Sequence, residues 1–197
     1  YNGAGVATGD FNNDGKADIF FASNEGRNTL YINQGALKFK DFTDQAKIPQ
    51  DSAWNTGVSL VDINNDGLLD IYICRLGNFE KFKNKNQLLV CQSIEKGVPV
   101  YKEMAAILCF SFAGTFDPLS GDRIFKNNNG HFEDVTKQSK INSTAISYGL
   151  GVVMSDINLD GWPDIYAGND FHENDYLYIN QKNGSFKDER QDWMTHT

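Results

Sequence analysis

One nine-residue pattern, Asp-x-Asn-x-Asp-Gly-x-x-Asp, occurs three times in this chain of 197 residues, at positions 10–18, 62–70 and 156–164. Oxygen-bearing side chains at the first, third, fifth and ninth positions of such a loop can converge on one hard cation. The backbone carbonyl of the seventh residue adds a further ligand, as in the first half of a calcium-binding loop. The pattern therefore predicts three divalent-cation sites, and calcium is the expected ion.

The predicted ligands form three equivalent sets, in which the seventh residue acts through its carbonyl. They are Asp10, Asn12, Asp14, Lys16 and Asp18; Asp62, Asn64, Asp66, Leu68 and Asp70; and Asp156, Asn158, Asp160, Trp162 and Asp164. The sixth residue is Gly15, Gly67 or Gly161, as expected where a sharp turn favours a residue without Cβ. An alternative is that these side chains form Asx turns and bind no metal. Crowded aspartates repel one another, however, and a cation would neutralise them.

The sequences around each loop exclude an EF-hand and favour a β-hairpin. An EF-hand needs a bidentate glutamate at the twelfth position, where this chain has Phe21, Ile73 and Ala167. Short runs of β-branched and aromatic residues precede and follow each loop, as at 5–9 and 19–21. Such runs indicate strands, so each loop is predicted to be the bend of a hairpin.

A second phrase, roughly Asn-x-Leu-Tyr-x-Asn followed by a turn and Phe-x-Asp-x-Thr, recurs between the loops. Its copies lie at 28–46, 86–104, 122–136 and 175–188, the second being the weakest match. Each copy predicts a further two-stranded hairpin with an Asn- and Gly-containing turn. One hairpin of each kind makes four strands, and a four-stranded unit that recurs about every 50 residues is typical of a β-propeller blade.

These repeats predict an all-β fold, a partial β-propeller of about three to four blades, each of four antiparallel strands. The predicted blades span residues 1–50, 51–106, 107–141 and 142–197. The third is expected to be incomplete, because the segment 107–119 has no aspartate-rich loop. We expect the chain to be a fragment of a propeller, since it starts at the entrance to a hairpin and ends in a polar stretch.

The extended pattern Gly-Val-x-x-x-Asp-x-Asn-x-Asp-Gly-x-x-Asp-Ile resembles the FG-GAP or VCBS repeat of integrin α-subunit propellers and of many secreted bacterial proteins. Together with the second phrase and residues 168–176, it resembles more closely the bacterial VCBS-repeat proteins related to cartilage acidic protein, which often end in an ASPIC/UnbV domain. The resemblance implies a calcium-binding propeller of seven or eight blades in an exported protein, whether extracellular, on the cell surface or periplasmic. Two departures are the missing metal hairpin at 105–121 and the absence of an ASPIC/UnbV domain.

Composition and charge restrict the classes of partner that the chain is expected to bind. The net charge is −8, and much of the acidity lies in the three loops, with no basic patch that would suit a nucleic acid. The sequence has no apolar run of about 18 residues, so no transmembrane segment is predicted. No Cys-x-x-Cys pair occurs among Cys74, Cys91 and Cys109. Cys74 and Cys91 lie in apolar, strand-like runs and are predicted to be buried thiols, with a single disulfide as the alternative.

Catalytic motifs are sparse, since no nucleophile elbow or His-Glu-x-x-His motif occurs. His172 lies in a polar cluster with Glu173 and Asp175, for which we expect a solvated loop rather than a catalytic or second metal site. We therefore expect structural calcium in a non-enzymatic scaffold that binds a protein or glycan partner. The alternative is a carbohydrate-active enzyme, a polysaccharide lyase or glycosidase, with its acidic pair among the acids outside the loops.

Overall fold

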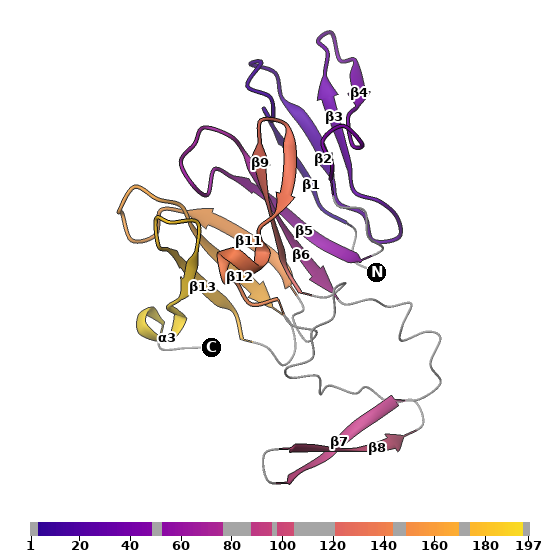
Figure 1. Cartoon of the computed structure of the whole chain (residues 1–197), viewed down its shortest axis with the longest axis vertical. Helices are drawn as coiled ribbons and strands as arrows, with labels where there is room; N and C mark the ends of the chain where they lie inside the picture. Colours follow the sequence, from indigo (N-terminus) through magenta and orange to yellow (C-terminus); the bar gives the residue numbers. More distant parts are fainter. Residues whose placement is uncertain are drawn as a thin grey trace.

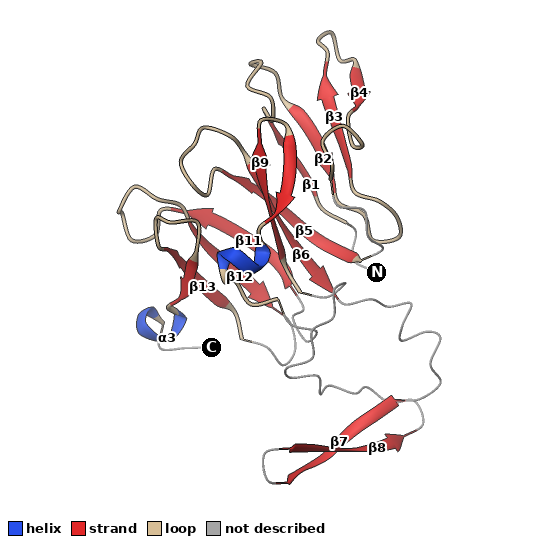
Figure 2. Ribbon diagram, in the orientation of Figure 1, coloured by secondary structure: helices blue, strands red, loops and turns tan. Residues whose placement is uncertain are grey.

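The computed structural model describes residues 4–48, 53–76, 88–95, 98–104, 121–143, 149–169 and 174–194. Within these residues the fold is all-β, with three four-stranded antiparallel sheets and one separate two-stranded hairpin (Figure 1). Two short helices, α2 (Thr136–Ser139) and α3 (Arg190–Trp193), follow the second and third sheets (Figure 2). The predicted fold class, blades of four antiparallel strands in a partial propeller, is confirmed.

The first sheet is a simple meander of β1 (Val6–Gly9), β2 (Asp18–Phe21), β3 (Thr29–Asn33) and β4 (Phe39–Asp41). Its first hairpin closes with Gly9 opposite Asp18. The aspartate-rich loop is therefore the bend between β1 and β2. The second repeated phrase forms β3 and β4, as its pattern predicted.

The third sheet repeats this topology with β11 (Gly149–Ser155), β12 (Asp164–Asn169), β13 (Tyr176–Asn180) and β14 (Phe186–Asp188). Ser155 pairs with Asp164, which places the third aspartate-rich loop at the equivalent bend. The repeated sequence thus folds into a repeated structural unit.

The second sheet is assembled from segments that lie far apart in the sequence. Its strands are β5 (Trp54–Val61), β6 (Asp70–Leu76), β9 (Arg123–Asn128) and β10 (His131–Asp134), in the order β10-β9-β6-β5. The strands β7 (Leu88–Glu95) and β8 (Val98–Met104) pair only with each other, in a hairpin inserted between β6 and β9.

This strand order differs from the predicted division into a blade at 51–106 and an incomplete blade at 107–141. The phrase at 122–136 completes the second sheet, because Ile71 pairs with Phe125 and Tyr72 with Ile124, and all four side chains are buried. The weaker phrase at 86–104 does form a hairpin, but outside the sheet. The segment 107–119, where the prediction placed a lost metal hairpin, lies outside the described residues.

The sheets pack face to face. Phe20 and Leu30 of the first sheet share a buried cluster with Ile71, Ile73 and Phe125 of the second. Because strand side chains alternate between the two faces, the face of β6 opposite Ile71 and Ile73 is free for the next sheet.

That opposite face packs on the third sheet. Tyr72 and Ile124 of the second sheet share another buried cluster with Ile165, Ala167 and Tyr178 of the third. We call the face that contacts the preceding sheet the leading face, and the face that contacts the following sheet the trailing face. The second sheet is covered on both, which explains the uninterrupted apolar run in β6.

Candidate metal-binding loops

The three aspartate-rich loops adopt one conformation. In the first loop the Asp10 carboxylate accepts backbone hydrogen bonds from Asp14 N at 3.0 Å and Gly15 N at 2.7 Å. Asp62 accepts the corresponding bonds at 3.0 and 2.7 Å, and Asp156 at 2.9 and 2.8 Å. The carboxylate at the first position therefore closes each turn over the residues that follow it.

The glycine at the sixth position has the predicted backbone role. Gly15, Gly67 and Gly161 have φ of 81°, 83° and 86°, in the left-handed region that penalises a Cβ. A Cβ at any of the three would meet no atom within 4 Å. The requirement for glycine is therefore conformational and not steric crowding.

The structure gathers the side chains at the first, third and fifth positions on the inside of the turn. In the first loop Asn12 donates from Nδ2 to Asp14 at 3.3 Å, and its Oδ1 accepts from Asp14 N at 3.2 Å. The other oxygen of Asp14 accepts a hydrogen bond from Lys16 N at 3.0 Å, so the backbone of the seventh residue lies beside the fifth-position carboxylate. The second and third loops repeat the Asn-to-Asp bond and the bond to the seventh residue.

The ninth-position aspartate has a role that the sequence did not reveal. Asp18 is fully buried, and its two carboxylate oxygens accept from Phe11 N at 2.9 Å and Asn33 N at 2.8 Å. Asp70 and Asp164 make the equivalent pairs of bonds. Each aspartate thus joins the start of its loop to the third strand of its sheet. A carboxylate has about four acceptor positions, so two backbone donors leave capacity for a cation.

Negative charge is concentrated in these loops. The pKa of Asp70 is raised to about 6, chiefly by burial and also by the neighbouring carboxylates of Asp66 and Asp62, against the opposing effect of its backbone hydrogen bonds. Burial likewise raises the pKa of Asp18. Like charges this close disfavour ionisation, and a bound cation would reverse that effect.

One buried oxygen in the second loop suits a cation. Asn64 Oδ1 is buried with no hydrogen-bond partner, whereas the Asn12 and Asn158 oxygens accept from the fifth residue of their own loops. Unpaired buried acceptors are rare and call for an explanation. Among the described residues no three His, Cys, Asp or Glu side chains form a metal cluster by themselves. An ion in any of these loops would therefore also need the amide oxygen of the third residue and the carbonyl of the seventh, which are ligand types that calcium takes.

Asparagines connect successive loops across the sheet boundaries. From the fourth loop position, Asn13 Nδ2 donates to Gly67 O at 3.1 Å, and Asn65 Nδ2 donates to Gly161 O at 3.2 Å. Each bond runs from one loop to the sixth residue of the next loop. The third loop has Leu159 at this position.

A second set of asparagines connects the sheets in the opposite direction. Asn127 and Asn180 each end the Asn-x-Leu-Tyr-x-Asn part of a copy of the second phrase. Asn127 Nδ2 donates to Phe11 O at 3.0 Å, and Asn180 Nδ2 donates to Ile63 O at 2.9 Å. Phe11 and Ile63 are the second residues of the preceding loops. The only sequence signal for these contacts was the asparagine that ends the Leu-Tyr-x-Asn phrase.

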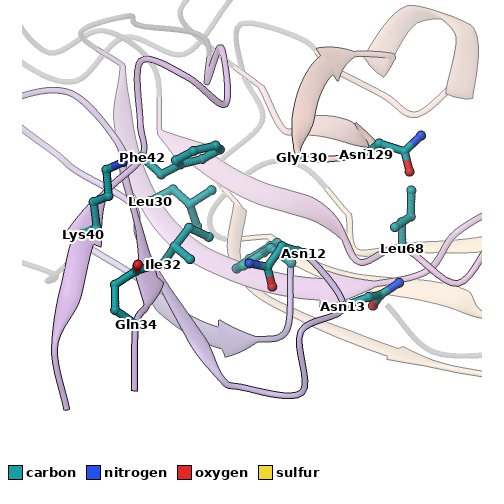
Figure 3. A pocket seen from close by; sticks show the side chains of 11 residues that line it. Asn12, Asn13, Leu30, Ile32, Gln34, Lys40, Phe42, Leu68, Asn129 and Gly130 are labelled. Atoms are coloured by element: carbon teal, nitrogen blue, oxygen red, sulfur yellow. The ribbon is translucent and has the colours of Figure 1, made fainter. Parts of the chain in front are cut away.

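A cleft of about 450 Å³ lies between the first and second sheets. Figure 3 shows Leu30, Ile32 and Phe42 between Lys40 and Gln34 on one side and Asn129 on the other. A similar cleft of about 350 Å³ lies between the second and third sheets. No carboxylate lines either cleft within the described residues.

The remaining predicted features do not form a second site in the described part of the chain. Asp175 accepts hydrogen bonds from the Tyr166 hydroxyl and from Asn169 N, so it links the residue before β13 to β12. His172 and Glu173 lie outside the described residues. Cys74 is a buried free thiol, whose pKa is raised by burial. The Cys91 side chain and Cys109 also lie outside. None of the described helices is long and apolar enough to cross a membrane.

Residues 4–73 and 112–167 match the family profile described as FG-GAP-like repeat. The chain is also similar to cartilage acidic protein 1 of Mus musculus, with 36% identity over 69 residues, and to that of Xenopus tropicalis, with 35% identity over 69 residues. Each alignment covers 35% of this chain and 11% of the relative. The match therefore spans about a tenth of the length of these curated relatives.

Proposed function

Because the chain belongs to the FG-GAP-like repeat family, we propose that it is a calcium-stabilised β-propeller module that binds a protein or glycan partner outside the cell. FG-GAP repeat domains are generally extracellular binding or scaffold domains. The observation that carries the proposal is the loop conformation shared by Asp10, Asp62 and Asp156, which places carboxylate, amide and carbonyl oxygens on one turn three times over.

The role of the metal in this proposal is structural. Calcium would neutralise the loop carboxylates and hold each hairpin bend, so its binding free energy would add to that of folding. The ligands would be the side chains at the first, third, fifth and ninth positions and the seventh carbonyl. Since Asn13 and Asn65 join neighbouring loops, rigid loops would also help to align neighbouring sheets.

The proposal is tested by titrating the metal-free protein with calcium in a calorimeter and by measuring its melting temperature. We expect three sites with dissociation constants of about 10⁻⁴ to 10⁻³ M, as in other extracellular calcium modules. Excess chelator should lower the melting temperature, and added calcium should restore it. A melting temperature that is the same in chelator and in calcium would refute the metal assignment.

A matched pair of variants locates the sites. Asp66→Ala should reduce the calorimetric stoichiometry from three to two, because it removes the fifth-position ligand of the second loop. Asp192→Ala removes an exposed carboxylate from α3 and should leave three sites. A stoichiometry of three in both variants would show that the second loop does not bind the ion.

The partner is tested separately. A glycan array, read both for retention and for chain cleavage, distinguishes a binding module from the alternative, a polysaccharide lyase or glycosidase. We expect retention or no signal, without cleavage, because the clefts between the described sheets lack the pair of carboxylates that glycosidases use. Cleavage would establish the enzymatic alternative and would leave the calcium assignment untouched.

A further inference from the structure

A lysine ammonium group lies beside the fifth-position carboxylate of every aspartate-rich loop. The Nζ–Oδ2 distances are 2.9 Å for Lys16 and Asp14, 3.6 Å for Lys126 and Asp66, and 3.2 Å for Lys182 and Asp160. In each loop the same oxygen accepts a hydrogen bond from the third-position asparagine, while the other oxygen accepts from the seventh residue N. The three lysines therefore contact the equivalent atom of their loops.

The three lysines come from three different positions of the repeat. Lys16 is the seventh residue of its loop, whereas Lys126 lies in the third strand of its sheet and Lys182 in the turn that follows the third strand. We matched the other sheets by loop position and by distance from the asparagine that ends the Leu-Tyr-x-Asn phrase. The corresponding residues are not lysines: they are Leu68 and Trp162, Ile32 and Ile179, and Gly35 and Asn129. The contact is therefore not copied with the repeated sequence, because each sheet makes it with a different residue.

The atom that the lysines contact belongs to a predicted calcium ligand. A carboxylate oxygen has about two acceptor positions, and the asparagine amide and the lysine ammonium group together use both of them on this oxygen. Two cations within a few ångströms of each other also repel. A lysine and a calcium ion are therefore alternative partners of the same oxygen.

The lysine side chains are free to make this exchange. Lys16, Lys126 and Lys182 are 43%, 31% and 47% exposed, and lysine carries its charge on a flexible four-carbon stem. A displaced ammonium group can therefore turn into water without disturbing the strand or turn that carries it.

We propose that Lys16, Lys126 and Lys182 compete with calcium for the fifth-position carboxylates of their own loops and so set the calcium affinity of each loop. This inference rests on the calcium assignment proposed above and adds three affinity-determining residues to it. The ammonium group offsets part of the repulsion between the loop carboxylates, and calcium replaces it at the fifth-position oxygen. Because exposed ion pairs are weak, removing one lysine should tighten calcium binding to its loop by about 1.4- to 5-fold.

Chemical labelling of amines, read residue by residue in a mass spectrometer, follows the displacement directly. A lysine held against a carboxylate reacts more slowly with an acylating reagent than a lysine in water. We expect calcium to raise the labelling rates of Lys16, Lys126 and Lys182 by about 1.4- to 5-fold, the factor by which an exposed ion pair holds its partner. Lys187 is the matched control, because it pairs with Glu189 at 2.9 Å outside the loops and its rate should not change.

Variants test the effect on affinity. Lys126→Met keeps an apolar stem and removes the charge, so calorimetry should show one site tightened by about 1.4- to 5-fold, and less calcium should be needed to raise the melting temperature. Lys126→Arg keeps a cation and should show no such gain, and Lys187→Met should bind calcium like the native chain.

Asp66→Ala links a lysine to its loop. Without its carboxylate partner, Lys126 should be labelled fast at every calcium concentration. Lys16 and Lys182 should keep their response to calcium, because their own loops are unchanged.

Failure of this proposal and failure of the calcium assignment give different results. If calcium binds and raises the melting temperature while the labelling rates of the three lysines stay constant, the lysines are not displaced and the competition is excluded. Lys126→Met with the calcium affinity of Lys187→Met would exclude Lys126 as an affinity-determining residue. Both of these results leave the calcium assignment standing, whereas a native chain that shows no calorimetric binding and no change in melting temperature overturns the assignment and the competition together.

Discussion

The asparagine at or beside the end of the third strand of each sheet should contribute to stability mainly where its side chain donates a hydrogen bond to the preceding sheet. Asn127 is fully buried, donates to Phe11 O at 3.0 Å and accepts from Gly130 N at 2.8 Å. Asn127→Ala removes both hydrogen bonds and leaves the carbonyl of the buried Phe11 without a donor. Two hydrogen bonds at about 1 kcal/mol each, plus about 1 kcal/mol or more for the unpaired carbonyl, give a loss of about 2–4 kcal/mol.

Asn33→Ala is the matched control. It also removes two hydrogen bonds, to Ala17 O and from Gly35 N, but Asn33 is only half-buried and its partners lie within its own sheet. Because water can replace these bonds, we expect a loss of about 1 kcal/mol. The difference between the two variants therefore isolates the boundary contact.

Both variants are measured by urea unfolding with tryptophan fluorescence, in saturating calcium, and compared by their midpoints. Asn127→Asp adds a sharper comparison, because it keeps the acceptor for Gly130 N and turns an oxygen towards Phe11 O in place of the donor. We expect it to be at least as destabilising as Asn127→Ala. If Asn127→Ala cost no more than Asn33→Ala, the hydrogen bond across the sheet boundary would contribute nothing to stability.

Three further predictions concern backbone, core and loop. Gly5→Ala should destabilise the protein more than Gly15→Ala, because a Cβ on Gly5 would lie 2.7 Å from Val58 N. A Cβ on Gly15 meets no atom within 4 Å and costs only conformational strain of about 1–2 kcal/mol. Thermal melts in calcium-containing buffer compare the two variants. Phe20→Ala should cost about 3–5 kcal/mol in urea unfolding, because its ring is fully buried, while the exposed Phe21→Ala should cost well under half of that. Asp70→Asn should lower the melting temperature even in chelator, because one of its two backbone donors would then face an amide N–H; a loss seen only in calcium would show that Asp70 acts purely as a ligand.

The hairpins and their bends were predictable because the interactions that form them are local. Asp10 bonds residues four and five positions ahead of it, and the glycine at the sixth position satisfies a backbone requirement within the same turn. The alternation of apolar residues on either side predicted the paired strands for the same reason. Nothing distant has to be known to place these features.

The composition of the second sheet was not predictable in this way. Two hairpins, at 88–104 and at 123–134, follow β6 in the sequence, and both carry the repeated phrase in some form. The structure selects the later one, since Ile124 and Phe125 pair with β6 and bury a side chain on each face. The β-strand propensity of either hairpin does not determine which one joins the second sheet, because that choice depends on packing between residues far apart in the chain.

By itself, the sequence determined three turns, their glycines and a concentration of oxygen ligands, because each depends on residues within nine positions of one another. Only the tertiary structure decided what surrounds those turns. It buried the ninth aspartates as bridges to the third strands, joined neighbouring sheets through Asn13 and Asn127, and left Phe21 exposed while its counterparts were covered. The physical reason is that burial and hydrogen bonding between sheets depend on which faces meet, and no local pattern records that.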